Sequence, residues 1–290
     1  MVPSVIIPLL VVTAMAVMVT TVHRRLPAVI ASRVVSITLI VTTSAALPTL
    51  WILGFGYLAH APYIGAAFGW CVEVFGSHDR ISPLIGIPCL ALAVVGAVRA
   101  ARVLRTHHRL RNDHPGSVEV TRNNQPFAFT LPGRGGRVVV STGLIELLDD
   151  NECAVVIAHE HAHATYRHDR YLLVAKLAST TIPMLRPLAS RLQFSLERWA
   201  DETAVNACGD RHFVARTLGK VALHGAVPVG VLGFTGLGVP ARVVALFGPP
   251  ALVPRSSLLI SLWLTIAGTG ALAAFQIHHL FSLVTALCPG

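Results

Sequence analysis

The stretch AHEHAHATYRHDR, which begins at Ala158, holds four histidines and one glutamate. His159 and His163 are four residues apart, so an α-helix would place both imidazoles on one face, one turn apart. Two such imidazoles can bind Zn²⁺, and a carboxylate beside them can take a proton from a metal-bound water. The spacing therefore predicts an HExxH zinc site with His159 and His163 as ligands and Glu160 as the general base.

A second polar stretch, ERWAD, offers a third ligand, which a catalytic zinc site usually needs beside one open position. Its carboxylates, Glu197 and Asp201, are four residues apart and share one face of a helix. We expect Glu197 to ligate the metal. We expect Asp201 to accept a hydrogen bond from the N–H of a ligand imidazole, on the nitrogen that does not bind the metal. The alternative is that both are solvated surface carboxylates, the usual state of charged residues.

The remaining histidines near these motifs fit the metal less well. His161 is rotated about 200° around the helix from His159 and should face away from the metal. His168 could reach the metal only if the helix bent, so we expect it not to be a ligand. His212 lies beyond the ERWAD helix and is a candidate for stabilising the oxyanion of a tetrahedral intermediate.

Local patterns predict the elements that would position these groups. β-Branched and aromatic residues separated by turn sequences predict three short strands. GLIELL predicts a short helix, and Asp149 with Glu152 predicts a capping box at the start of a longer helix that runs through His163. The strands are Ser117–Arg122, Phe127–Leu131 and Arg137–Ser141, and a helix from about Ser190 to Cys208 would carry ERWAD after the breaks at Pro183 and Pro187.

The composition indicates a membrane protein: the chain of 290 residues is 53% hydrophobic and 13% charged, with a mean hydropathy of +0.65. Four stretches without Asp, Glu, Lys or Arg are near or above the roughly 20 residues that cross a bilayer. They are Val2–Val22, Val34–Leu58, Ile81–Val98 and Ser256 to about Val284. The first could be a cleaved signal peptide, but its cations follow the apolar run, which favours a membrane helix.

The distribution of arginines predicts the orientation. Arginines lie between the first two membrane segments and again after the third, which places both regions in the cytoplasm. Both termini and the loop His60–Arg80 would then face outward. We expect a membrane domain at residues 1–98, a cytoplasmic α+β zinc protease domain at 99–255 and a last membrane helix at 256–284.

Other classes of function are disfavoured. The formal net charge of +9 would suit nucleic acid in a soluble protein, but here many cations flank membrane segments and would face anionic lipids. No nucleic-acid motif is visible. The five cysteines form no CxxC pair, so they predict neither a zinc ribbon nor a disulfide framework.

The apolar stretch YLLVAKLASTTIPMLRPL is too short for a fifth membrane crossing, so it predicts a buried or membrane-grazing helix.

The combination of PFAFTLPG, RVVVSTGL, VVIAHEHAHATYRHD and ERWADETA resembles the membrane-embedded gluzincin metallopeptidases. More narrowly it is similar to the BlaR/MecR type, and more distantly to HtpX and the CAAX prenyl proteases. The resemblance implies a minigluzincin-type domain with one zinc ion per chain, bound by His159, His163 and Glu197. It also implies that the strand of Phe127, Ala128, Phe129 and Thr130 is an edge strand that pairs with an extended peptide substrate.

The resemblance leads us to expect an endopeptidase that cuts a cytoplasmic or membrane protein, with a transcriptional repressor as the leading substrate. Alternatives are an HtpX-like quality-control protease and a non-catalytic zinc sensor with His168 or His212 as a fourth ligand. BlaR-type sensors carry an extracellular penicillin-binding domain after the last membrane helix, and no SxxK motif stands there, so we do not expect direct β-lactam sensing. The Gly- and Pro-rich segment Gly225–Pro250 is assigned only as a membrane-proximal linker with short helices.

Overall fold

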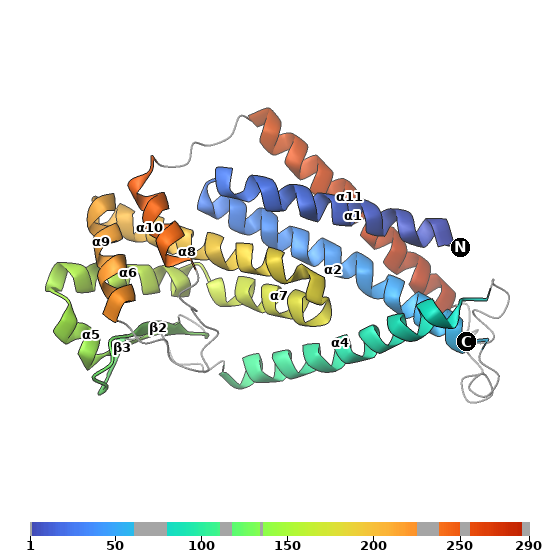
Figure 1. Ribbon diagram of the computed structural model, residues 1–290, viewed down its shortest axis with the longest axis horizontal. Helices are drawn as coiled ribbons and strands as arrows, with labels where there is room; N and C mark the ends of the chain where they lie inside the picture. Colours follow the sequence, from blue (N-terminus) through green and yellow to red (C-terminus); the bar gives the residue numbers. More distant parts are fainter. Residues whose placement is uncertain are drawn as a thin grey trace.

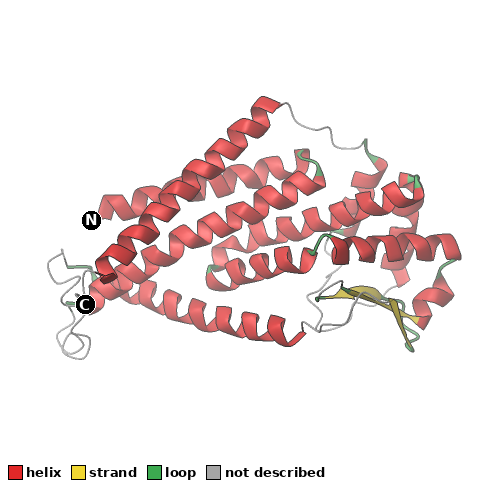
Figure 2. Cartoon of the chain, turned by 180° about the vertical axis from the view of Figure 1, so that it is seen from behind, coloured by secondary structure: helices red, strands yellow, loops and turns green. Residues whose placement is uncertain are grey.

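The computed structural model describes residues 2–60, 80–110, 118–133, 136–224, 238–249 and 256–285. The protein is elongated: long helices run side by side along most of its length, and a small sheet lies with shorter helices at one end (Figures 1 and 2). The first residues of α1 lie at the end of the bundle that is far from the sheet (Figure 1). The fold is mainly helical with a small three-stranded sheet, and this part of the predicted class is confirmed.

The four predicted membrane segments are all helical. They form α1 (Val2–Val22), α2 (Ala28–Leu58), α4 (Pro83–Leu110) and α11 (Ser256–Thr285). Among the residues described, α2 and α4 are long and apolar enough to cross a membrane. The other two crossings and the orientation stay predictions, and most of the loop His60–Arg80 lies outside the described residues.

α4 presents apolar side chains outward along the predicted span. Leu84 is 87% exposed, and several aliphatic side chains that follow it are also exposed: Ile85, Ile87, Leu92, Val94, Val95 and Val98. An apolar surface of this length is unfavourable in water and is typical of contact with lipid or another protein. The exposed face therefore supports the predicted span, although the helix continues beyond Val98 to Leu110.

The three predicted strands form one sheet in the order β1-β3-β2. The strands are β1 (Val118–Thr121), β2 (Ala128–Leu131) and β3 (Arg137–Ser141). The central strand β3 is parallel to β1 and antiparallel to β2. β2 is thus an edge strand of the described sheet, as the resemblance implied. Gly136 precedes β3 at φ +60°, where a Cβ would collide with Ala164, so Gly136 itself lies directly against the helix that carries HExxH.

Side-chain caps fix the start of the next two helices. Ser141 ends β3 and accepts hydrogen bonds from the backbone N–H of Leu144 and of Phe127, which joins α5 (Thr142–Leu147) to the edge strand. Asp149 and Glu152 form the predicted capping box at the start of α6 (Asp150–Thr165). The HExxH motif therefore lies on a helix whose first turn is held in place by its own sequence.

The helices after α6 form a hairpin that packs into the bundle. α7 (His168–Thr181) and α8 (Arg186–Cys208) are joined at Pro183. α8 starts earlier than predicted because Pro187 occupies its first turn, where no intrahelical N–H is needed. With 14 residues, α7 is too short to cross a membrane alone, as predicted.

One hydrophobic core joins this hairpin to the predicted membrane helices. Leu188, Leu192 and Leu196 of α8 are buried together with side chains of α1, α2, α7 and α11, including Val35 and Leu39 of α2. The helix α8, which carries ERWAD, thus lies directly against α2. The boundaries at residues 98 and 255 remain predictions, but the two predicted domains share apolar packing.

Two further helices cover the outer end of α6 and α8. α9 (Arg211–His224) packs on α10 (Val239–Phe247), and Leu246 of α10 is buried beside Val155 and Val214. α10 is the one described element of the Gly- and Pro-rich segment. This segment therefore contributes a docked helix as well as a connection.

Candidate active site

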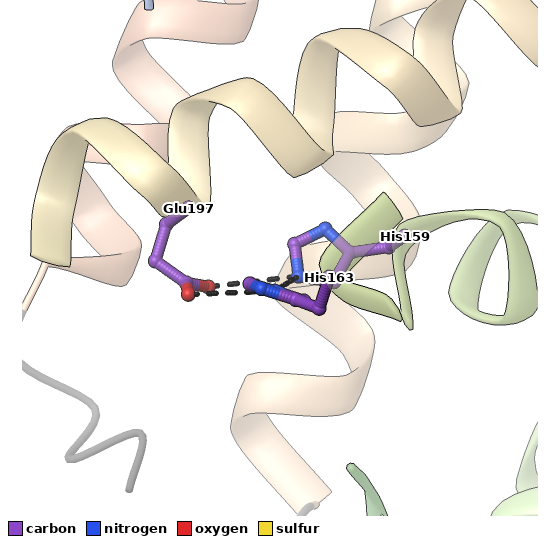
Figure 3. A group of neighbouring side chains, drawn as sticks. All are labelled: His159, His163 and Glu197. Carbon is purple, nitrogen blue, oxygen red and sulfur yellow. Dashed lines mark hydrogen bonds and ion pairs between the residues drawn. The ribbon is translucent and has the colours of Figure 1, made fainter. Parts of the chain in front are cut away.

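Three predicted ligands meet between α6 and α8 (Figure 3). Nε2 of His159 lies 3.2 Å from Nε2 of His163. The carboxylate of Glu197 lies 3.5 Å from each of these nitrogens, through Oε2 and Oε1 respectively. The helical spacing brings the imidazoles together, and the packing of α8 on α6 supplies the carboxylate.

These distances fit one tetrahedral Zn²⁺ ion. With bonds of about 2.0–2.1 Å, neighbouring ligand atoms in such a site lie about 3.3 Å apart. Three ligands leave a fourth position for water or substrate, as in catalytic zinc sites. Glu197 is only 6% exposed and Asp201 3%, so the alternative of two solvated surface carboxylates is wrong.

Asp201 holds the far side of a ligand ring, as predicted. Its Oδ1 lies 3.1 Å from Nδ1 of His159. Burial lowers the pKa of His159, but hydrogen bonds and charge from Asp201 and Glu197 outweigh this effect and raise the pKa to about 10. Zinc binding requires loss of that proton. The same two carboxylates that stabilise the imidazolium would stabilise the positive charge of the metal.

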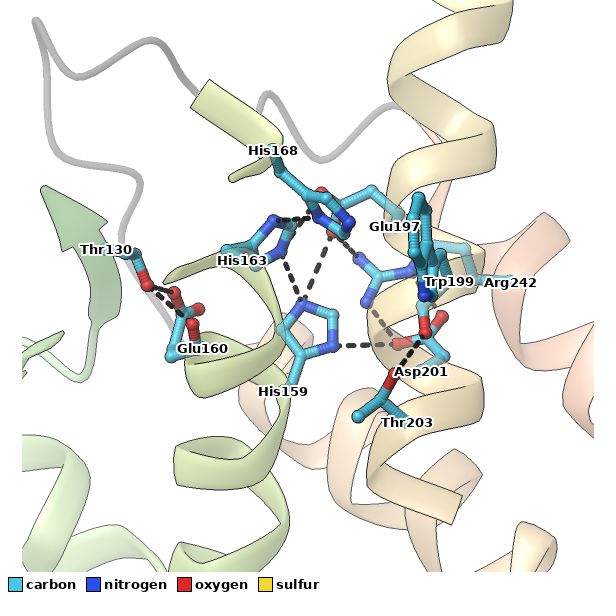
Figure 4. A network of polar contacts seen from close by, with 10 residues as sticks. All are labelled: Thr130, His159, Glu160, His163, His168, Glu197, Trp199, Asp201, Thr203 and Arg242. Atoms are coloured by element: carbon cyan, nitrogen blue, oxygen red, sulfur yellow. Dashed lines mark hydrogen bonds and ion pairs between the residues drawn. The ribbon is translucent and has the colours of Figure 1, made fainter. Parts of the chain in front are cut away.

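Arg242 of α10 is a central member of the site that sequence reasoning missed (Figure 4). It donates hydrogen bonds to both oxygens of Asp201, at 2.8 and 2.6 Å, and its Nη1 lies 2.9 Å from Oε2 of Glu197. Burial would lower the pKa of Arg242, but the two carboxylates raise it, so the guanidinium stays charged. Arg242 is the single charged residue between Gly225 and Pro250, and a lone charge in an apolar segment was the available signal.

His168 lies behind His163, outside the group of possible ligands formed by His159, His163 and Glu197. The chain turns at Arg167, whose φ of 55° is left-handed, and α7 then places His168 against α6. Nδ1 of His168 is 2.8 Å from Nδ1 of His163, on the side of that ring opposite the metal-binding Nε2. Burial, with the charge of His159, lowers the pKa of His168 to about 3, so its neutral ring can accept a hydrogen bond.

Glu160 lies beside the ligands and is tied to the edge strand (Figure 4). The hydroxyl of Thr130 lies 2.8 Å from Oε2 of Glu160 and 2.8 Å from its backbone carbonyl. Burial raises the pKa of Glu160, although the charge of His159 and the hydrogen bond from Thr130 act in the opposite sense. The site thus combines a buried carboxylate with an adjacent cluster of metal ligands.

The structure does not bring His212 to this cluster. His212 is exposed at the start of α9, where its backbone N–H bonds to Asp210 and its ring contacts Phe247. Its role in stabilising an oxyanion stays a prediction without a supporting contact among the described residues. His161 is also exposed, as expected from its place on the helix.

The register of β2 on β3 sets the direction of the main-chain groups of the edge strand. Phe127 accepts a backbone hydrogen bond from Ser141 of β3. In an antiparallel pair the bonded positions alternate, so the main-chain groups of Ala128 and Thr130 point away from β3, toward the free edge. Within the described part of the chain, no further strand pairs with this edge.

Residues 98–196 match the family model described as Peptidase family M48. This part of the chain resembles an M48 peptidase. The match includes HExxH and stops one residue before Glu197, which the geometry adds independently. It supports zinc as the metal, and it does not confirm the narrower BlaR/MecR type.

Two proteins with similar sequences are also described as a metallopeptidase and a protease. The chain is 29% identical over 163 residues to the plastoglobule-localized metallopeptidase 48 of Arabidopsis thaliana, over 52% of this chain and 43% of that protein. It is 38% identical over 78 residues to a protease HtpX homolog of Acidiphilium cryptum (strain JF-5), over 26% of this chain and 27% of that protein. The chain spans less than half the length of these relatives.

Proposed function

We propose that this protein is a membrane-bound zinc metalloendopeptidase. The observation that carries the proposal is the convergence of His159, His163 and Glu197 at tetrahedral spacing, with Glu160 beside them. When bound, zinc would polarise the scissile carbonyl and activate a water molecule. Glu160 would take the proton of that water and pass it to the leaving amine.

The chain's own residues account for the remaining requirements. The free edge of β2 would align an extended peptide through Ala128 and Thr130. Asp201 and Arg242 hold His159 and Glu197 in their ligating orientations. A closed four-ligand site is disfavoured, because His168 lies on the far side of His163 and His212 contacts Phe247 on the surface.

The test is the substitution Glu160→Gln, which keeps the size of the side chain and removes its basicity. We expect it to abolish proteolysis and to leave the zinc content at one ion per chain, because Glu160 is not a ligand. Peptide hydrolysis and metal content are measured on the same purified sample. Hydrolysis at the wild-type rate would refute this role of Glu160, and loss of zinc would show that the residue is needed for the site itself.

Two substrate classes follow from this activity. One substrate would be a transcriptional repressor, cut as a regulatory step. The other would be misfolded membrane proteins, degraded in HtpX-like quality control. The similarity to an HtpX homolog favours the second. New protein N-termini, compared between cells with wild type and with the Glu160→Gln variant, separate the two. One or two cut regulators would indicate signalling, whereas many cut membrane proteins would indicate quality control.

A further inference from the structure

The turn between the first two helices lies against α8, close to the site (Figure 1). This turn, η1 (His23–Arg25), follows α1 directly and leads into α2. The guanidinium of Arg24 lies over the ring of Phe194, 5.9 Å from its centroid. The loop at the end of the membrane helices is therefore in direct contact with the helix that supplies Glu197.

Positive charge is concentrated at this junction. Arg191, Phe194 and Arg198 follow one another at helical spacing, so they lie on the same side of α8. His23 of the turn is buried, at 3% exposure. Burial lowers the pKa of His23, and the charges of Arg191, Arg24 and Arg198 add to this effect, against the hydrogen bond to Thr20. The three guanidinium groups thus lie near enough to His23 for their charges to act on it.

No carboxylate of the described chain neutralises these arginines. None of the ion pairs formed among described residues includes Arg24, Arg191 or Arg198. Glu202 and Asp201 act on Arg198 through their charge, but Glu202 is bound by Arg211 and Asp201 by Arg242. Arg24 is exposed, but Arg191 and Arg198 are partly buried. Partly buried cations without a nearby counter-charge are unfavourable unless an anion binds to them.

The position of the cluster indicates which anion it would bind. The turn connects Val22, the end of α1, to Ala28, the start of α2, and both helices are apolar segments of the predicted membrane domain. Such a junction lies at the level of lipid head groups, and basic pockets between membrane helices bind anionic head groups. Guanidinium groups match phosphate oxygens in a two-point arrangement.

We propose that Arg24, Arg191 and Arg198, at the contact between the α1–α2 turn and α8, bind the phosphate of an anionic phospholipid. The lipid would join the α1–α2 turn to α8 and so fix the helix that carries Glu197 relative to the membrane. This site is distinct from the proposed peptidase chemistry, since it requires neither zinc nor Glu160.

The test measures lipid binding to the full chain in a non-ionic detergent. Phosphatidylglycerol, phosphatidylcholine and inorganic phosphate are each titrated against the protein, and the thermal unfolding midpoint is followed. We expect phosphatidylglycerol alone to raise the midpoint in a saturable way. In the double variant Arg24→Gln with Arg191→Gln, the half-saturating lipid concentration should rise about thirtyfold, because each arginine near an anionic lipid contributes about fivefold.

A matched control removes two other arginines that follow a membrane helix, Arg102→Gln with Arg105→Gln, which are exposed on α4. This control should bind phosphatidylglycerol as the wild type does. Equal loss of binding in both double variants would overturn the proposed site in favour of general charge attraction. Unchanged binding in the first variant would overturn it as well, and equal protection by inorganic phosphate would overturn the assignment to a lipid. The unfolding midpoint without lipid shows that each variant is folded.

Discussion

At the scale of single residues, the orientation of the metal ligands depends on neighbours that do not touch the metal. His168 contacts Nδ1 of His163, and Thr130 contacts Glu160. Partners of this kind fix the tautomer of a ligand imidazole and the direction of a carboxylate. With Nε2 of His163 on the metal, its Nδ1–H would donate to the neutral ring of His168.

His168→Phe tests this hydrogen bond. The substitution keeps a ring of similar shape but removes the acceptor, so zinc affinity should fall about 10- to 100-fold. The fold should persist, because Nε2 of His168 has no hydrogen-bond partner among the described residues. Competition with a chelator gives the affinity. His168→Asn, which restores an acceptor near Nδ1, should recover part of the loss; equal zinc affinity in the Phe variant would contradict the role.

Thr130→Val tests the link between the general base and the edge strand. Valine keeps the branched shape and removes the hydroxyl, so Oε2 of Glu160 loses its donor. We expect kcat to fall about tenfold, because the loss of a hydrogen bond to a charged group has an effect of this size. KM and zinc content should stay near wild type. Thr130→Ser should restore kcat. An effect confined to KM would show that Thr130 acts only through peptide binding.

At the scale of elements, the site depends on how α10 docks. α6 and α8 bring together the ligands, but the cation that balances Glu197 and Asp201 comes from a nine-residue helix beyond α9. Removal of one partner from a buried ion pair leaves an uncompensated charge, which costs far more than the loss of an exposed pair. α10 is therefore part of the support of the metal site.

Arg242→Met should lower the free energy of unfolding of the metal-free protein by about 3–5 kcal/mol. Arg242→Lys should be intermediate, because lysine keeps the charge but cannot bind Asp201 with two nitrogens. Denaturant titration measures both. The control is Arg137→Gln, which breaks a partly exposed pair with Glu119 and should cost at most about 1 kcal/mol. Equal losses in the Met variant and the control would argue against a buried network.

At the scale of the whole molecule, the metal-binding helices and the predicted membrane helices share one core. Leu192 and Leu196 of α8 are fully buried against this bundle, five residues before Glu197 and Asp201 respectively on the same helix. A displacement of α2 relative to α8 would therefore move a metal ligand. The shared core predicts that the bundle and the site unfold together.

Leu192→Ala should lower the free energy of unfolding by about 2–5 kcal/mol, because it leaves a cavity between α8 and the bundle. The thermal transition should stay single, and loss of zinc should coincide with loss of helix, as followed by circular dichroism and a zinc indicator. Leu223→Ala on α9 is the control, since that side chain is 84% exposed. Release of zinc well before helix loss would show that the site unfolds separately.

The sequence alone determined the features that depend on local spacing. The HExxH pair, the capping box of Asp149, the three strands and the choice of Glu197 and Asp201 all follow from helical or strand periodicity over a few residues. These patterns are visible because neighbouring residues in one element have fixed relative directions.

Only the tertiary structure decided which distant groups complete the site. Arg242 reaches Asp201 across 41 positions, and Thr130 reaches Glu160 across 30. His168 is near in sequence, but it reaches His163 only because the chain reverses at the left-handed Arg167. The shared core of α8 and α2 could not be predicted from the sequence either. An apolar face shows that a helix is covered, but it does not show which element covers it. Periodicity encodes the direction of a side chain, and packing alone selects its neighbour.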